Sequence, residues 1–399
     1  MMTVRSFAII ACASVLAIFL GQMACAQETI KVGELNSYKS QTAFLDPYKK
    51  GWEMAVDEIN AKGGVLGKKL EVISRDDGSN PGEAVRVADE LVTREGVNIL
   101  AGTFLSNIGL AVTEFAGKKQ VFFLAAEPLT DKITWQNGNK YTFRLRPQTY
   151  MQTAMLLPDA LAAKKKRWAL VYPNYEYGQA AAAAFKEMMK AKQPDVEFVT
   201  EQAPPLGKVD AGAVVQAIDD AKPDGIFIFY PGAHGVQFVK QWAQSGLNKT
   251  VPLYQVFSID AITLPQQGDL ALGTLGAQEW VNDQPNEQNK RYVADFKKKH
   301  GVYPSYYGAQ SYDAIMLVAS AAEALKGDLS NKDKVRAELK KANFKSLRGD
   351  FKYNTNNFPI ENFYIQETVK DPQGMMTVKT IATAVKDAKD SYYEKCPMK

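Results

Sequence analysis

Residues 97–107, VNILAGTFLSN, constrain the possible fold more than any other segment of the chain. An apolar run leads into a turn of small residues, after which a helical repeat begins at Ile108. A parallel strand that passes directly into a helix leaves free N–H groups and the positive end of the helix dipole facing a crevice, which favours an anion. We therefore treat Ser106 and Asn107 as candidate ligand-binding residues. The simpler alternative is that Thr103, Ser106 and Asn107 only cap the helix.

The same alternation of strand and helix patterns extends along the chain and restarts in its second half. Strands are expected at 29–35, 69–74, 97–102, 121–126, 168–172, 196–200, 225–230, 251–256 and 363–368, and helices at 52–59, 81–91, 108–115, 179–192, 211–221, 236–245, 289–300, 307–325 and 331–342. Such alternation gives parallel sheets with helices on both faces. Because 399 residues exceed what one hydrophobic core usually supports, the restart indicates two lobes. Segments 141–146, 276–286 and 351–353 are the expected crossings between them.

The N-terminus has the pattern of a secretory signal. Arg5 precedes an apolar run from Phe7 to Leu20, and Ala24-Cys25-Ala26 is a small-x-small cleavage pattern. We expect cleavage after Ala26 and export to the periplasm. Removal of this segment leaves Cys396 as the only cysteine, so we expect no internal disulfide.

Composition argues against several classes of function. The net charge is only +4 and no basic stripe is present, so nucleic acid is not an expected partner. The chain has two histidines, His234 and His300, with no metal-ligand spacing and no phosphate-binding glycine loop. We expect no enzymatic activity, no metal and no cofactor.

Several local phrases, taken in order, resemble the branched-chain-amino-acid-binding (Leu/Ile/Val-binding) family of periplasmic ABC-transporter receptors. They are the helix over 51–59, the phrase Asn60-Ala61-Lys62-Gly63-Gly64, the pair Asp76-Asp77 after a strand, and Tyr177-Gly178. The resemblance implies a type I periplasmic binding protein fold, α/β, with two doubly wound parallel-sheet lobes joined by three crossings. Lobe boundaries are expected at 27–146 plus 280–352 and at 147–279 plus 353–399. A monomer that closes on a small molecule and delivers it to a membrane permease is also implied.

The resemblance also implies ligand contacts. It places the ligand carboxylate at Ser106, near the backbone of Ala125 and the side chain of Glu127. It matches an aromatic of the first helix loop to Phe44 and a second-lobe aromatic to Tyr177. The family's remaining loop aromatic falls on Ala233, beside His234, and its ammonium-binding acid falls around Val256 to Ser258, with Asp260 as a nearby substitute.

The missing acid shifts the expected ligand away from amino acids. A buried ammonium without a partner costs several kcal/mol, whereas aromatic residues near the cleft suit a flat ring with one carboxylate. The aromatic candidates are Phe44, Phe104, Tyr175, Tyr177 and Phe257. We expect an aromatic acid of the benzoate or hydroxycinnamate type. A branched-chain or other amino acid or amide remains an alternative, and a sensory ligand-binding protein is a third.

Overall fold

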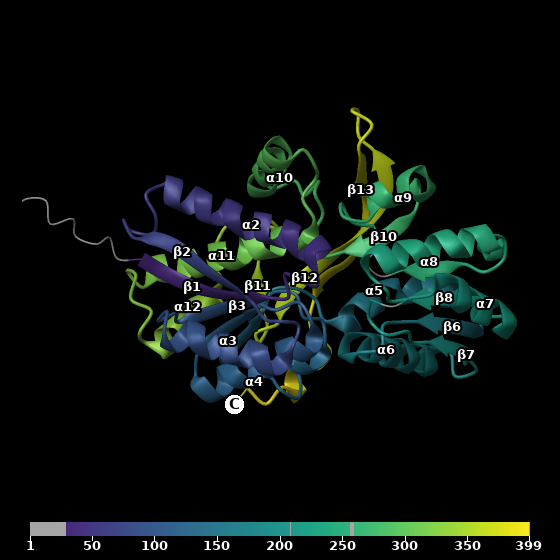
Figure 1. Cartoon of the computed structure of the whole chain (residues 1–399), viewed down its shortest axis with the longest axis horizontal. Coiled ribbons are helices and arrows are strands. Elements are labelled where there is room, and N and C mark those ends of the chain that lie inside the picture. The colour runs from purple at the N-terminus through teal and green to yellow at the C-terminus, as the bar shows by residue number, and fades with distance from the viewer. Residues whose placement is uncertain (1–28, 208, 256–258, 399) are drawn as a thin grey trace, which may run out of the picture.

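The computed structural model describes residues 29–207, 209–255 and 259–398. The expected signal segment and the candidate Phe257 lie outside the described residues. Two α/β lobes lie side by side, with a third, antiparallel sheet where they meet (Figure 1). The predicted fold class is therefore confirmed.

The first lobe is built on a parallel sheet of order β2-β1-β3-β4-β5. Its strands are β1 (Thr29–Asn36), β2 (Lys69–Asp76), β3 (Ile99–Gly102), β4 (Phe122–Ala125) and β5 (Thr142–Arg144), and its helices include α2 (Thr42–Ala61), α3 (Pro81–Thr93), α4 (Ser106–Lys119) and the short η2 (Asp131–Thr134). Local sequence explains the helix starts. Asn80 accepts a hydrogen bond from the backbone N–H of Glu83, and Pro81 stands at the first helical position, where its missing N–H costs nothing.

The second lobe repeats the plan with a parallel sheet of order β7-β6-β8-β9. It comprises α5 (Thr149–Ala162), β6 (Arg167–Val171), α6 (Glu176–Lys192), β7 (Glu197–Gln202), α7 (Ala211–Ala221), β8 (Gly225–Ile228), α8 (Gly232–Ser245), η3 (Leu247–Lys249), β9 (Leu253–Gln255), α9 (Leu264–Gln267) and η4 (Gly268–Ala271). Helix α8 begins four residues earlier than the sequence pattern indicated, because only the apolar repeat from Val236 onward was visible in the sequence.

The remaining chain crosses between the lobes, and part of it packs on the first lobe. It contains β10 (Leu275–Gln278), α10 (Glu287–His300), α11 (Tyr306–Ala324), α12 (Lys332–Lys341), β11 (Lys352–Tyr353), β12 (Pro359–Lys370), β13 (Met376–Ala388) and η5 (Tyr393–Lys395). Strands β10 and β11 pair antiparallel with β12, as does β13. The sequence pattern did not predict β13, because most of its residues are exposed and three register shifts interrupt its pairing with β12.

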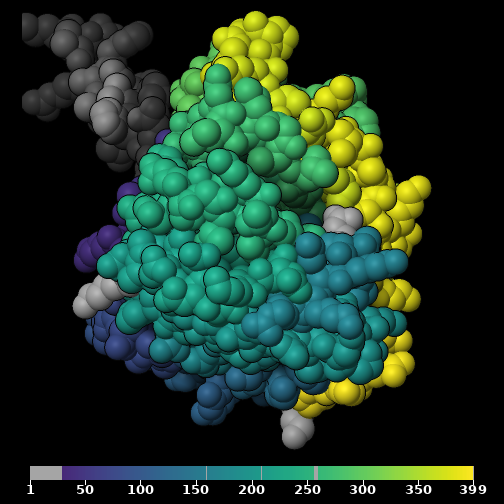
Figure 2. Space-filling model, turned by 90° about the vertical axis from the view of Figure 1, so that its right-hand side faces the viewer, coloured from purple at the N-terminus to yellow at the C-terminus, as the bar shows by residue number. Residues whose placement is uncertain are grey.

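The C-terminal residues lie along one side of the molecule, below the β12–β13 hairpin (Figure 2). They contact both lobes through Tyr392, whose ring stacks on Trp135 at 3.9 Å and whose hydroxyl donates to Glu187 at 3.1 Å. Among the described residues, no helix combines the length and the apolar character needed to cross a bilayer.

Helices α2 and α11 pack with their backbones in direct contact. A Cβ atom added at Gly51 would lie 2.0 Å from the carbonyl oxygen of Gly308 and 2.4 Å from the hydroxyl of Ser311. Ser311 also donates a 2.6 Å hydrogen bond to the carbonyl of Tyr48, so the two helices cannot separate locally without loss. This contact attaches α11, which follows the second lobe in sequence, to the first lobe.

We predict that Gly51→Ala lowers the free energy of unfolding by about 1–3 kcal/mol, because the added methyl group overpacks a backbone contact. Urea denaturation of purified protein measures the change. Gly212→Ala in α7 is the matched control: its Cβ would meet Asp210 Oδ1 at 3.4 Å, an ordinary contact. The control should be neutral or gain up to about 1 kcal/mol. Equal losses in both variants would contradict the packing argument.

Candidate functional site

The carboxyl ends of the two parallel sheets face one another across a cleft that is closed in this structure. The ring of Phe44, from the first lobe, lies against Gly232, where an added Cβ would approach the ring to 2.4 Å. Thr130 donates a 2.8 Å hydrogen bond from the first lobe to Glu176 of the second, and Lys132 pairs with the same carboxylate at 3.0 Å. The lobes are thus in direct contact at the cleft.

The turn between β3 and α4 is strained. Gly102 has φ 114°, and an added Cβ there would lie 2.4 Å from the carbonyl oxygen of Leu35. Thr103 has φ 54°, a conformation that costs free energy for a β-branched residue. Its buried hydroxyl has no hydrogen-bond partner among the described residues. Strain and an unsatisfied hydroxyl at a strand end are features of a binding site.

Ser106 is not the N-cap of α4 but its first residue. The cap position belongs to Leu105, which provides no side-chain hydrogen bond. The buried Ser106 oxygen instead accepts from the backbone N–H groups of Leu129 at 3.2 Å and Thr130 at 3.1 Å, so it holds the loop after β4. Its own proton can still be donated to a ligand oxygen. Asn107 is exposed and lies outside the buried cluster described below.

The loop after β4 is held by side chains that donate hydrogen bonds to its backbone carbonyls. The buried Arg144 guanidinium donates to the carbonyl of Thr130 at 2.7 Å and to that of Pro128 at 2.5 Å. Burial lowers the pKa of Arg144 to about 10, which leaves it charged at neutral pH. Thr149 donates to the carbonyl of Leu129 at 2.9 Å. The Glu127 side chain therefore projects from a rigid segment.

A buried ion pair joins Glu127 to Arg146. Arg146 Nη1 and Glu127 Oε2 are 2.5 Å apart, and the two side chains are 1% and 0% exposed. Burial raises the pKa of Glu127 to about 8, with a contribution from Glu279 and opposition from Arg146. The pKa of Arg146 is also raised: burial opposes its charge, but the carboxylates of Glu127 and Glu279 outweigh that effect. Glu127 Oε1 has no hydrogen-bond partner among the described residues.

Aromatic rings surround this pair. Phe44 and Phe104 stack with centroids 5.1 Å apart, and Tyr307 lies 5.4 Å from Phe44 and 5.9 Å from Phe104. The Arg146 guanidinium lies 5.5 Å from the Tyr307 ring centroid and 5.2 Å from that of Tyr306. Cation–π contact stabilises a buried guanidinium in such a position.

The second lobe adds Tyr175 and Tyr177, whose centroids are 5.9 Å apart. Burial raises the pKa of both hydroxyls. Tyr177 lies in the same apolar cluster as Tyr307, and Tyr175, Phe44 and Phe104 pack against that cluster. Tyr177 belongs to the first turn of α6 rather than to the loop in which the sequence pattern placed it.

The other candidates take different positions. Ala125 is fully buried at the end of β4, where its carbonyl accepts from the N–H of Leu145 at 3.2 Å. His234 lies in the first turn of α8, not in a loop, and its ring stands 5.8 Å from that of Tyr230. Its buried Nδ1 has no partner among the described residues.

The Asp260 carboxylate accepts hydrogen bonds from backbone N–H groups. Its Oδ1 accepts from the N–H of Ile262 at 2.7 Å, and its carboxylate also accepts from the backbone of Tyr306. Burial raises the pKa of Asp260 to about 7, and Arg146 lies within electrostatic range. The carboxylate thus fixes the start of α11.

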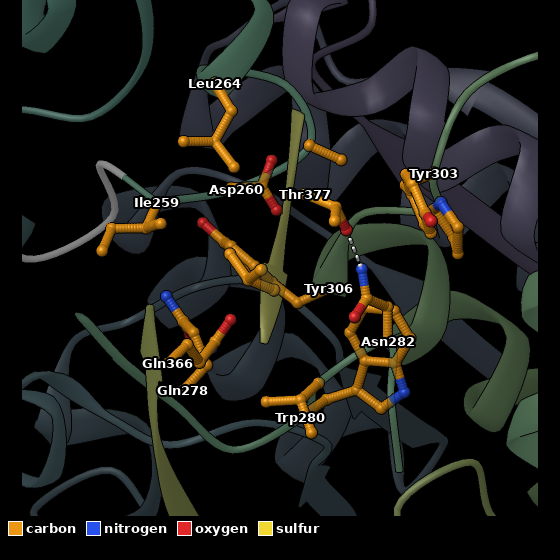
Figure 3. Close-up of a pocket in the computed structure, with 14 residues that line it drawn as sticks. Ile259, Asp260, Leu264, Gln278, Trp280, Asn282, Tyr303, Tyr306, Gln366 and Thr377 are labelled. Carbon is orange, nitrogen blue, oxygen red and sulfur yellow. Dashed lines mark hydrogen bonds between the residues drawn. The ribbon is translucent and has the colours of Figure 1, made fainter. Parts of the chain in front are cut away.

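A small cavity of about 20 Å³ borders Asp260 and Tyr306 (Figure 3). Gln278 and Gln366 line its lower part in that view, and the amide of Asn282 donates to Thr377 at 2.7 Å on the far side. A space of this size holds one water molecule or two, not a ring-bearing ligand. None of Phe44, Phe104, Tyr175 and Tyr177 lines this cavity, so it is not the space that those rings enclose.

Arg146, Tyr306 and Tyr307 were not expected as site residues from the sequence. Arg146 ends the first crossing, directly before Pro147, and the available signal was the pair Arg144 and Arg146 in an otherwise apolar segment. Tyr306 and Tyr307 follow a crossing and begin α11, so their approach to a first-lobe strand end depends on the tertiary fold.

Comparison with known proteins assigns the chain to a family. A family model described as periplasmic binding protein matches residues 29–373. The Leu/Ile/Val-binding protein homolog 6 of Brucella melitensis is 26% identical over 380 residues, covering 92% of this chain and 95% of that relative.

Two solved structures extend the comparison. A solute binding protein of an ABC transporter from Rhodopseudomonas palustris BisB5, in complex with 3,4-dihydroxybenzoic acid, is 30% identical with a TM-score of 0.79, covering 90% of this chain and 98% of that one. A solute binding protein from R. palustris in complex with benzoate has a TM-score of 0.83 at 23% identity, covering 92% and 99%, and shows a shared fold.

Four buried carboxyl groups predict that the stability of the folded protein falls as pH rises. Burial raises the pKa of Glu34, Asp131 and Asp260 to about 7 and that of Glu127 to about 8. In the unfolded chain these groups titrate near pH 4. Between about pH 4 and 8 the folded protein therefore binds more protons, so its stability is greatest at low pH in this window and falls as pH rises.

We predict a larger free energy of unfolding at pH 5 than at pH 8, measured by urea denaturation at several pH values. Glu34→Gln, which removes one of these groups, should flatten the dependence. Stability that rises from pH 5 to pH 8 would show that these carboxyls are ionised in the folded protein.

Proposed function

Because the chain belongs to the periplasmic binding protein family, we propose that it is the receptor of an ABC importer for an aromatic carboxylate of the benzoate or hydroxycinnamate type. The observation that carries the proposal is the aromatic enclosure of the cleft: Phe44, Phe104 and Tyr307 from one side, Tyr175 and Tyr177 from the other. A planar ring makes large apolar contacts in such an enclosure. The R. palustris relative that is 30% identical was solved with an aromatic acid.

The carboxylate belongs at the start of α4. This helix of 14 residues has no side-chain cap, so its first N–H groups and positive dipole end can receive an anion. The proton of Ser106 and the unsatisfied hydroxyl of Thr103 are further donors beside it.

Amino acids fit the cleft less well. The two carboxylates that could neutralise a ligand ammonium, Glu127 and Asp260, both lie in the field of Arg146, and Asp260 already accepts backbone hydrogen bonds. A branched-chain amino acid remains the second candidate, because the Brucella relatives carry that name.

Other parts of the proposal follow from the family. The signal segment would be cleaved after Ala26, and the mature monomer would bind its ligand without chemical conversion and deliver it to a permease. The moving bodies would be 27–146 plus 280–352 and 147–279 plus 353–399.

We predict that aromatic acids raise the melting temperature of the purified protein and that leucine, isoleucine and valine do not. A ligand at 100 times its dissociation constant stabilises the folded state by about 2.7 kcal/mol, which a thermal shift resolves. Benzoate, 4-hydroxybenzoate and 4-hydroxycinnamate form the test panel. A shift with branched-chain amino acids alone would contradict the proposed ligand class and favour the second candidate.

Closure of the cleft should depend on Gly232. We predict that Gly232→Ala weakens ligand binding at least tenfold and reduces the ligand-induced fall in radius of gyration measured by X-ray scattering, because the added methyl group meets the Phe44 ring. Gly246→Ala, at the other end of α8, is the matched control: its φ of 84° is also positive, but nothing lies within 4 Å of the added atom. Normal closure in Gly232→Ala would show that the Phe44 contact is not required.

A further inference from the structure

The Glu127–Arg146 pair is a buried polar pair beside the aromatic side chains of the cleft. Its guanidinium lies against the rings of Tyr306 and Tyr307, and Tyr307 in turn lies against Phe44 and Phe104. One carboxylate oxygen is bound by Arg146, and the other, Oε1, has no hydrogen-bond partner among the described residues. A buried polar atom without a partner is rare in folded proteins, because its desolvation is not compensated.

The charge of the pair limits what can complete it. A second carboxylate at Oε1 is opposed by the negative potential of Glu279 and by Glu127 itself. An ammonium there competes with Arg146 for the same carboxyl group. A neutral group that can both donate and accept is compatible with either protonation state of Glu127: it donates to the carboxylate or accepts from the acid.

We propose that the free oxygen of Glu127 is the receptor for a ring hydroxyl of the ligand, remote from its carboxylate, so that the protein selects hydroxylated aromatic acids over unsubstituted ones. This inference rests on the proposed function, because it assumes an aromatic acid whose carboxylate lies at the start of α4. In this arrangement the ligand ring lies between the start of α4 and Glu127, with the aromatic side chains against its faces.

Selectivity follows from the cost of an unfilled site. When benzoate closes the cleft, Glu127 Oε1 stays buried without a partner, and water is excluded by the surrounding rings. A site built to bind a hydroxyl discriminates strongly against an analogue that lacks it. Loss of one hydrogen bond to a charged or strongly polar group corresponds to about 10- to 100-fold in affinity.

Calorimetric titration of the wild-type protein with a matched ligand series tests the inference. We expect 3- or 4-hydroxybenzoate to bind about 10- to 100-fold more tightly than benzoate and than 4-methylbenzoate, which fills the same volume without a hydroxyl. Salicylate, whose hydroxyl is adjacent to the carboxylate, should bind no more tightly than benzoate.

A variant that makes the pair apolar tests its position. In Glu127→Leu/Arg146→Met both charges are removed together, which avoids an unpaired buried ion. The preference for the hydroxylated acid should fall to threefold or less. Glu176→Gln, which alters another carboxylate at the cleft, should change the affinity for both acids similarly and leave their ratio unchanged.

The outcomes separate the two proposals. Equal wild-type affinities for benzoate and both hydroxybenzoates would overturn the hydroxyl receptor and leave the aromatic-acid function standing. Binding of none of the aromatic acids would overturn the function and this inference with it. A preference for the hydroxylated acid that persists in the double variant would also overturn the assignment to Glu127. If the double variant does not fold, the wild-type ligand series decides alone, and equal affinities for benzoate and the hydroxybenzoates overturn the assignment.

Discussion

Buried charge at the junction of the lobes is the constraint on which the rest of the structure depends. Three buried groups contribute to it: Arg146 pairs with Glu127, Glu279 accepts from Gln310 at 2.5 Å, and Arg348 binds both Glu361 and Asp313. Removing one member of a buried pair leaves an uncompensated ion, at a cost of about 3–5 kcal/mol. The segments that carry these groups must therefore lie together, and the lobes are held in register by electrostatics as well as by packing.

This network also shapes the chemistry of the cleft. Arg146 belongs both to the junction and to the ring-lined site, because its guanidinium lies against Tyr306 and Tyr307. Two carboxylates that could have met a ligand ammonium, Glu127 and Asp260, are thereby engaged by a cation or by backbone N–H groups. The same residues that fix the junction make the cleft better suited to a neutral or anionic aromatic ligand than to an amino acid.

Local signals predicted most of the helices and strands of the two lobes but neither α5 nor β13, and they did not predict every residue in the site. Helix α7, expected over 211–221, is found at Ala211–Ala221. Its apolar repeat and its N-cap residue Asp210 are both local features of the sequence. Ser106 shows the limit. Its type suggested a cap, yet its oxygen accepts from Leu129 and Thr130, residues brought close only by the pairing of β3 with β4.

By itself the sequence determined the two α/β lobes and their order along the chain, because apolar periodicity and capping residues act over a few positions. Tertiary structure decided the rest. Strand β13 has little buried pattern and exists through its pairing with β12, and Tyr307 meets Phe44 only because α11 packs on α2. Contacts between residues hundreds of positions apart depend on packing and burial, which no local pattern encodes.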